Sequence, residues 1–310
     1  MALGAMHLGT KIGYADSCGI LDAYVEAGGV WIDTANCYAF WASASGYGGQ
    51  SETLLGDWIA SRNAHEHVRL STKVGAEPCT PGGFPQDVEG LGQRVVQAAV
   101  HQSLNRLRVE KIDLFWAHME DRSQSISQVT STFGELVTRG LVSEIGLSNH
   151  PAWYAAIANT YAKQSSTPEF TALQLRESYL HPRPDIPVEG EDHPNGMMTA
   201  ESRDYAARAG ISLWAYTPLL NGLYEHPERP LPAAYEHPGS HIRLARIHRW
   251  ASGLGIKPSQ VVLAWLTNTL PQIMPVVGCS TPAQVREAIE ATSMTLPTEV
   301  LNDLNALDQA

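Results

Sequence analysis

The chain alternates short β-rich runs with longer segments in which apolar residues recur at helical spacing. This alternation is typical of a parallel sheet whose strands are joined by crossover helices. Strands are predicted at 5–8, 30–33, 68–73, 112–117, 143–147, 172–175, 211–216 and 273–277. Helices are predicted at 19–27, 51–61, 92–107, 125–139, 153–163, 198–209 and 259–267. Eight such strands predict an α/β fold, the (β/α)8 TIM barrel, with residues 1–310 as a single domain.

The amino-acid composition limits the kinds of partner that the protein is expected to bind. Hydrophobic residues make up 44% of the chain, enough for a sizeable core. The 21 Lys and Arg against 32 Asp and Glu give a net charge of −11, which disfavours a nucleic-acid backbone or an anionic membrane surface as partner. No apolar run approaches the ~20 residues that span a bilayer, and the amino terminus lacks a secretory signal. We therefore expect a cytoplasmic protein.

The four cysteines are far apart and form no CxxC pair. Cys18, Cys37, Cys79 and Cys279 therefore indicate neither a disulfide framework nor a zinc site, and no metal is expected.

Four long irregular segments, 39–49, 75–90, 179–196 and 219–240, each follow a predicted strand. In a barrel they would gather over one end, where unusually long loops are commonly functional. The stretch 181–195 is rich in proline and acidic residues, which also suits a mobile surface loop.

Polar residues with complementary chemistry stand at the ends of three consecutive strands. Asp33 and Tyr38 follow the second strand, Lys73 ends the third, and His118 follows the fourth. A phenol with an ordinary pKa near ~10 donates protons poorly at neutral pH, and a neighbouring ammonium favours its phenolate. A carboxylate can hold that ammonium in place, and a neutral imidazole can donate a hydrogen bond to a carbonyl oxygen. The set suits carbonyl reduction, and since no side chain supplies hydride, a nicotinamide cofactor is predicted.

Each residue alone has an ordinary explanation. Asp33 could cap a turn after its strand, Tyr38 could be a half-buried rim aromatic, and His118 alone would more often be a satisfied core or surface histidine. Lys73 is harder to explain by packing, because a lysine within an apolar strand is seldom buried unpaired. Their occurrence at successive strand ends favours the catalytic interpretation.

Several motifs resemble the signatures of the aldo-keto reductase family, and they occur in the family's order along the whole chain. The catalytic motifs are Asp-Thr-Ala-Asn-Cys-Tyr at 33–38, the lysine ending 70–73, Ser-Leu-Asn-Arg-Leu at 103–107, Ile-Asp-Leu at 112–114 with His118, and Gly-Leu-Ser-Asn at 146–149. Three further parts of the chain are similar to the family's cofactor-binding segments: Gln174, residues 215–223 and residues 278–284.

The resemblance implies roles residue by residue. Tyr38 would be the general acid, Lys73 and Asp33 its tuning pair, and His118 the donor that orients the substrate. The residues implied in cofactor binding are Ser148, Asn149 and Gln174 at the carboxamide, Tyr216 stacked on the nicotinamide, Leu219 and Gly222 at the pyrophosphate, and Ser280, Gln284 and Glu287 around the adenosine end. The family resembled here uses neither a metal nor a Rossmann fold.

The adenosine segment departs from the family pattern. Ser280 stands where many members place a basic residue against the 2′-phosphate, and Arg286 is the only cation in that segment. Ala288 replaces a common asparagine. NADP(H) is favoured on the resemblance, with NAD(H) as the alternative.

The expected activity is reversible, NADP(H)-dependent reduction of a small-molecule aldehyde or ketone. Phe40 and Trp41 are expected to face the substrate above Tyr38, the alternative being that they pack their segment onto the barrel. A different class of function, a cofactor-binding regulatory subunit of the same fold without significant turnover, stays open. A metal-dependent hydrolase is disfavoured, because only Asp33 and His118 qualify as strand-end ligands.

Overall fold

A computed structural model describes residues 1–188 and 196–306. Eight parallel strands close into a barrel in the order β1 to β8, with β1 paired to both β2 and β8. The strands are β1 Ala2–Gly4, β2 Trp31–Asp33, β3 Arg69–Val74, β4 Ile112–Ala117, β5 Val142–Ser148, β6 Ala172–Arg176, β7 Ser212–Tyr216 and β8 Ile273–Gly278. The predicted (β/α)8 TIM barrel is confirmed.

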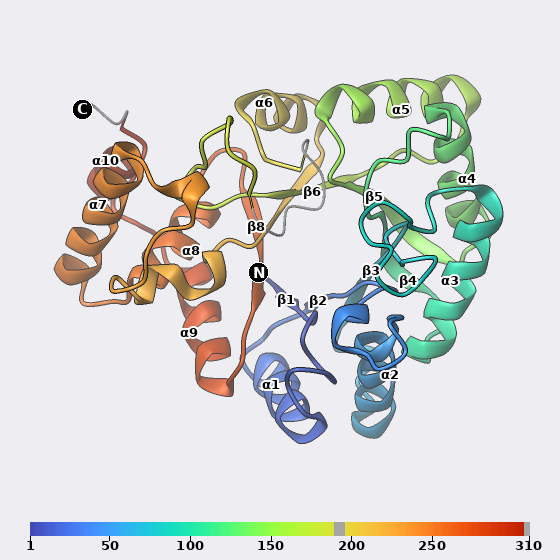
Figure 1. The fold of residues 1–310 in the computed structure, drawn as a ribbon, viewed down its shortest axis with the longest axis horizontal. Helices are drawn as coiled ribbons and strands as arrows, with labels where there is room; N and C mark the ends of the chain where they lie inside the picture. The colour runs from blue at the N-terminus through green and yellow to red at the C-terminus, as the bar shows by residue number, and fades with distance from the viewer. Residues whose placement is uncertain (189–195, 307–310) are drawn as a thin grey trace.

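Helices form a ring outside the strands (Figure 1). They are α1 Tyr14–Glu26, α2 Gln50–Arg62, α3 Gln93–Leu107, α4 Ile126–Thr138, α5 Ala152–Ser165, α6 Ala200–Ala209, α7 Pro238–Leu254, α8 Pro258–Asn268, α9 Pro282–Ser293 and α10 Thr298–Leu304. Local signals explain several helix starts: Ser125 and Gln128 form a capping box at α4, and Thr281 caps α9. Within residues 1–188 and 196–306, no helix combines the length and apolar character needed to cross a bilayer.

Aromatic side chains pack together inside the barrel. Alternate residues of a strand face inward, and the ring of Trp214 lies 5.2 Å from that of Trp31 and 5.4 Å from that of Trp116. Gly146 on β5 makes room for this cluster, because a Cβ there would lie 2.3 Å from the Trp116 ring. The interior of the barrel is therefore a packed core.

Two expectations about the elements were wrong. The first strand was predicted at 5–8, but β1 is Ala2–Gly4, and the following residues turn, with Leu8 donating its N–H to the Ala5 carbonyl at 3.0 Å. The segments 39–49 and 219–240 were predicted to be irregular, yet the first contains the short 3₁₀ helix Phe40–Ala42. The second contains the 3₁₀ helices Leu220–Glu225 and Ala233–Tyr235, and α7 begins at Pro238. Proline is favoured in the first turn of a helix, so Pro238 marks a helix start here.

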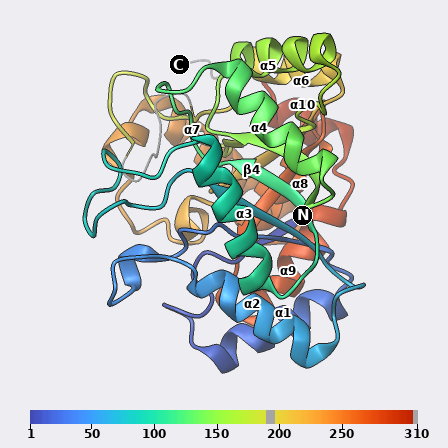
Figure 2. The ribbon, with the colours of Figure 1, turned by 90° about the vertical axis from the view of Figure 1, so that its right-hand side faces the viewer.

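Long segments gather at the end of the barrel where β2, β3 and β7 terminate at Asp33, Val74 and Tyr216, called the mouth below. Figure 2 shows them on one side of the molecule, to the left in that view. In the predicted loop 181–195, residues 181–188 form turns and are largely exposed, whereas 189–195 lie outside the described residues.

Candidate active site

The four residues predicted to carry the chemistry meet at the mouth. Asp33 ends β2, Lys73 lies in β3, His118 directly follows β4, and Tyr38 lies in the segment after β2. The Lys73 Nζ lies 2.5 Å from Asp33 Oδ2 and 3.5 Å from the Tyr38 hydroxyl oxygen. Because Asp33 and Lys73 are both buried, the ammonium is fixed beside the phenol with little access to water.

The buried ion pair is supported by neighbouring groups. Lys73 Nζ also donates to the Thr34 carbonyl at 2.8 Å. The second carboxylate oxygen of Asp33 accepts from Ser71 Oγ at 2.6 Å and from Gln174 Nε2 at 3.1 Å. Burying a charge pair is tolerated when additional hydrogen bonds satisfy both partners, as these do.

His118 is buried beside Tyr38. The two rings lie 5.8 Å apart, nearly perpendicular, and His118 Nδ1 lies 3.7 Å from Cys37 Sγ. Burial lowers the pKa of His118 well below its usual value, and the positive charge of Lys73 lowers that pKa further. The imidazole is therefore neutral near pH 7, and a neutral imidazole still has one N–H to donate.

The residues predicted to bind a carboxamide share the mouth. Ser148 ends β5, Asn149 follows it with a left-handed φ of 57°, and Gln174 lies in β6. Asn149 Nδ2 donates to the His118 carbonyl at 3.0 Å, and Asn149 Oδ1 accepts from the Tyr216 hydroxyl at 2.8 Å. Each amide has two donor hydrogens and two acceptor lone pairs, so these bonds do not exhaust the capacity of Asn149.

The segment after β7 has a strained backbone. Thr217, Leu220 and Asn221 have positive φ values of 55°, 47° and 56°, and Gly222 has a φ of 84°. Residues other than glycine rarely adopt such angles, and the strain clusters at ligand-binding sites. The N–H of Gly222 donates to the Leu219 carbonyl at 2.9 Å, so this predicted pyrophosphate donor is engaged within its own turn.

The predicted adenosine end lies at the start of α9. The Ser280 N–H donates to Gln284 Oε1 at 2.7 Å, and both residues are exposed. Glu287 Oε1 accepts from Lys257 Nζ at 2.6 Å. Lys257, at the start of α8, therefore brings a second cation to α9, which its distance in sequence did not reveal, and Arg286 Nη2 lies 4.0 Å from Glu26 Oε2.

The two aromatic residues after Tyr38 differ in environment. Phe40 is half-buried, with its ring 5.2 Å from that of Phe84, as the packing alternative expected. Trp41 is 44% exposed, and its ring lies 6.1 Å from the Tyr38 ring. Trp41 is thus the one of the pair that stays accessible beside the phenol.

Sequence reasoning missed three neighbours of the site. Ser71 and Arg176 each lie two residues along a strand from a predicted site residue, Lys73 and Gln174, so strand alternation could have found them. No sequence pattern could single out the Thr34 carbonyl, because every residue carries a backbone carbonyl.

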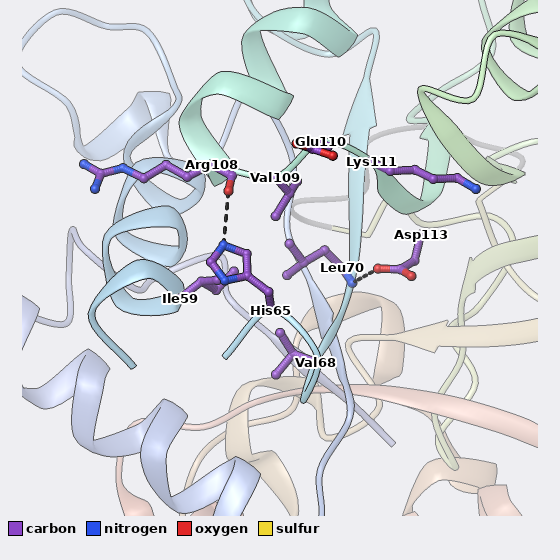
Figure 3. Close-up of a pocket in the computed structure, with 9 residues that line it drawn as sticks. All are labelled: Ile59, His65, Val68, Leu70, Arg108, Val109, Glu110, Lys111 and Asp113. Atoms are coloured by element: carbon purple, nitrogen blue, oxygen red, sulfur yellow. Dashed lines mark hydrogen bonds between the residues drawn. The ribbon is translucent and has the colours of Figure 1, made fainter. Parts of the chain in front are cut away.

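A cavity of about 470 Å³ lies at the opposite end of the barrel, where β3 and β4 begin (Figure 3). Its lining is Ile59, His65, Val68, Leu70, Arg108, Val109, Glu110, Lys111 and Asp113. The side chains of Arg108 and Lys111 extend away from one another in Figure 3, and Asp113 accepts the Leu70 N–H at 2.8 Å. In TIM-barrel enzymes chemistry occurs at the carboxyl ends of the strands, so this cavity lies at the wrong end.

Within the part of the chain that the structure describes, no group of three His, Cys, Asp or Glu side chains could hold a metal ion.

The chain is similar to known proteins along nearly its whole length. The model of the aldo/keto reductase family matches residues 1–309. An aryl-alcohol dehydrogenase from Pestalotiopsis microspora is 28% identical over 292 residues, covering 92% of this chain and 70% of the relative. A norsolorinic acid reductase from Emericella nidulans is 28% identical over 318 residues, covering 98% and 76%. An uncharacterized oxidoreductase from Bacillus subtilis is 26% identical over 313 residues, covering 98% and 90%.

Proposed function

The chain belongs to the aldo/keto reductase family of oxidoreductases, and on that premise we propose that it reversibly reduces an aldehyde or ketone, with Tyr38 as the proton donor. The observation that carries the proposal is the Lys73 ammonium held between the Asp33 carboxylate and the Tyr38 hydroxyl. The substrate is a small molecule with a carbonyl group, in keeping with relatives named as reductases and dehydrogenases.

Members of this family generally use nicotinamide cofactors, and the residues at the mouth fit one. Ser148, Asn149 and Gln174 offer amide and hydroxyl groups for a carboxamide, and half-buried Tyr216 offers a ring face. The remaining proposed contacts are Leu219 and Gly222 in the strained turn, and Ser280, Gln284 and Glu287 at α9. A nicotinamide held there would supply the hydride for the carbonyl carbon.

The protein's side chains then manage the proton. The Tyr38 hydroxyl transfers its proton to the carbonyl oxygen, so the C=O double bond becomes a C–OH group and the phenol becomes a phenolate. The Lys73 ammonium stabilises that phenolate, and Asp33 holds the ammonium in place. Neutral His118 donates a hydrogen bond to the same oxygen. Alcohol oxidation runs through the reverse transfers.

Two further details belong to the proposal. NADP(H) is preferred over NAD(H) on the family resemblance alone, because the two cations near α9, Lys257 and Arg286, already face Glu287 and Glu26. Exposed Trp41 contacts the substrate above Tyr38, with Phe40 supporting it by packing.

The test is an absorbance assay of NADPH and NADH consumption with 4-nitrobenzaldehyde, combined with calorimetric titration of both dinucleotides. The proposal expects binding of NADPH at least about tenfold tighter than that of NADH, and turnover with the aldehyde. Dinucleotide binding without turnover across a carbonyl panel would support the regulatory-subunit alternative, and no binding of either dinucleotide would refute both.

A further inference from the structure

Arg176, the last residue of β6, is a buried cation with an unsatisfied guanidinium nitrogen. The residue is only 7% exposed, and its Nε has no hydrogen-bond partner among the described residues. Across residues 1–188 and 196–306, no ion pair involves Arg176. Fully buried arginines are rare unless they are paired, so this one requires an explanation.

The orientation of Arg176 follows from its strand. Successive side chains of a strand point to opposite faces, so Ala172, Gln174 and Arg176 share the inner face of the barrel. Gln174 shows which face this is, because its amide reaches Asp33. Arg176 stands about 7 Å further along the strand toward the mouth, directly beside Tyr216 of β7 in the strand register.

Two described carboxylates already have cations: Glu177, the next residue, and Asp33, which Gln174 contacts. Glu177 points to the other face and lies 3.2 Å from Arg203 and 3.4 Å from His181. Asp33 is held by Lys73. Burial of an unpaired guanidinium is unfavourable, and a ligand that brings negative charge to the mouth removes that cost.

Hydrogen bonds fasten the residues after Arg176 to the strained segment after β7. Ser178 Oγ donates to the Pro218 carbonyl at 2.7 Å, and the Tyr224 hydroxyl lies 2.7 Å from Ser178 Oγ and accepts the Leu180 N–H at 3.0 Å. Arg176 therefore lies alongside the turn that contains Leu219 and Gly222, which the proposed function assigns to the pyrophosphate.

We propose that Arg176 is a cofactor-binding residue whose guanidinium pairs with a pyrophosphate oxygen of the bound dinucleotide. The proposal rests on the proposed function and adds to it a cation at the mouth, apart from those near α9. A guanidinium suits this role because it presents several N–H donors in a plane that matches phosphate oxygens.

The test compares Arg176→Met, which keeps an apolar stem and removes the charge, with wild type in calorimetric titrations with NADPH. The expected result is a Kd for NADPH raised about 10- to 100-fold, the range for loss of a hydrogen-bonded charge pair. Arg203→Met is the matched control, because Arg203 already has Glu177 as partner, and its Kd should stay within about twofold of wild type.

Thermal unfolding separates binding from folding damage. Removing an unpaired buried charge should leave the Tm of the ligand-free protein equal or higher, while the rise in Tm on adding NADPH becomes smaller. A lower ligand-free Tm together with an unchanged Kd for NADPH would assign Arg176 a structural role and overturn the proposal.

A matched pair of substrates tests whether Arg176 instead binds a carboxylate on the substrate. If Arg176→Met raises the KM for 4-carboxybenzaldehyde but not for 4-nitrobenzaldehyde, and the Kd for NADPH is unchanged, Arg176 binds a substrate carboxylate and the proposal is wrong. If wild type binds no dinucleotide, the proposed function itself fails, whereas normal wild-type binding with an unaffected Arg176→Met variant refutes this inference alone.

Discussion

Lys73 Nζ and Asp33 Oδ2 lie 2.5 Å apart, and both side chains are almost completely buried. The pair joins two neighbouring strands, β2 and β3, at the level where Tyr38 approaches from the following segment. If either charged side chain is replaced, burial keeps water from solvating the charge that remains. On the proposed function, a change at this pair therefore affects both stability and proton transfer.

The first prediction concerns that coupling. Asp33→Asn leaves the Lys73 ammonium buried without a counter-ion, which should lower the free energy of unfolding by about 3 kcal/mol or more and kcat by at least about 100-fold. Urea unfolding and steady-state kinetics measure the two effects. The double variant Asp33→Asn/Lys73→Met should regain much of the stability and none of the activity. A double variant as unstable as the single one would show that the unpaired charge is not the cause.

The second prediction concerns the pH dependence from His118. Since burial lowers its pKa in the folded state, the unfolded chain binds a proton at this residue more readily below about pH 6.5. Unfolding free energy should therefore fall as pH decreases from 6.5 to 5, and His118→Gln should flatten that fall. Exposed His67→Gln is the control and should leave the slope as in wild type. An unchanged slope in His118→Gln would mean that His118 binds its proton equally well in the folded and unfolded states, contrary to a lowered pKa.

The third prediction concerns Glu77, which accepts the Gly48 N–H at 2.8 Å and so links segments 75–90 and 39–49. Burial raises the pKa of Glu77 to about 7, and the nearby Glu89 adds to the rise. The folded state thus holds this proton more tightly than the unfolded state, so stability present at pH 4.5 is lost as pH rises through 7. Glu77→Gln should reduce that loss in pH-dependent urea unfolding, whereas Glu201→Gln at an exposed helix position should not.

The fourth prediction tests the packed interior. Gly146→Ala places a methyl group 2.3 Å from the Trp116 ring and should destabilise the protein by about 1–3 kcal/mol. A methyl group at Gly253 in α7 would meet nothing within 4 Å, so Gly253→Ala should be neutral or stabilising by up to about 1 kcal/mol. Thermal unfolding of the two alanine variants checks the contrast. Equal Tm values for both would contradict the account of the barrel interior.

Much of the barrel was predictable because apolar residues recur at different spacings in strands and in helices. The predicted strands at 30–33, 112–117 and 273–277 overlap β2, β4 and β8, and a barrel then requires their carboxyl ends to meet. The short β1 was misplaced, since a three-residue strand carries almost no periodicity. Helices α7, α9 and α10 were not predicted, although proline marks the starts of α7 and α9.

The candidate site was predictable as far as side chains follow strand ends. Asp33, Lys73 and His118 end or follow adjacent strands, so topology brings them together, and Tyr38 reaches them from the segment after β2. Contacts that depend on distant elements were not predictable: Lys257 reaches Glu287 from another helix, and the Thr34 carbonyl receives Lys73 through backbone geometry. Whether a buried cation such as Arg176 has a partner also depends on packing that no local pattern encodes.

The central claim, that Tyr38 is the proton donor, is tested most directly by Tyr38→Phe, which removes only the hydroxyl. The measurement is the single-turnover rate of NADPH oxidation with saturating 4-nitrobenzaldehyde, after calorimetry has given the Kd for NADPH. If Tyr38 donates the proton, the variant's rate is at least about 100-fold below wild type while its Kd stays within about threefold of the wild-type value. A variant that binds NADPH normally and oxidises it at the wild-type rate would contradict this claim.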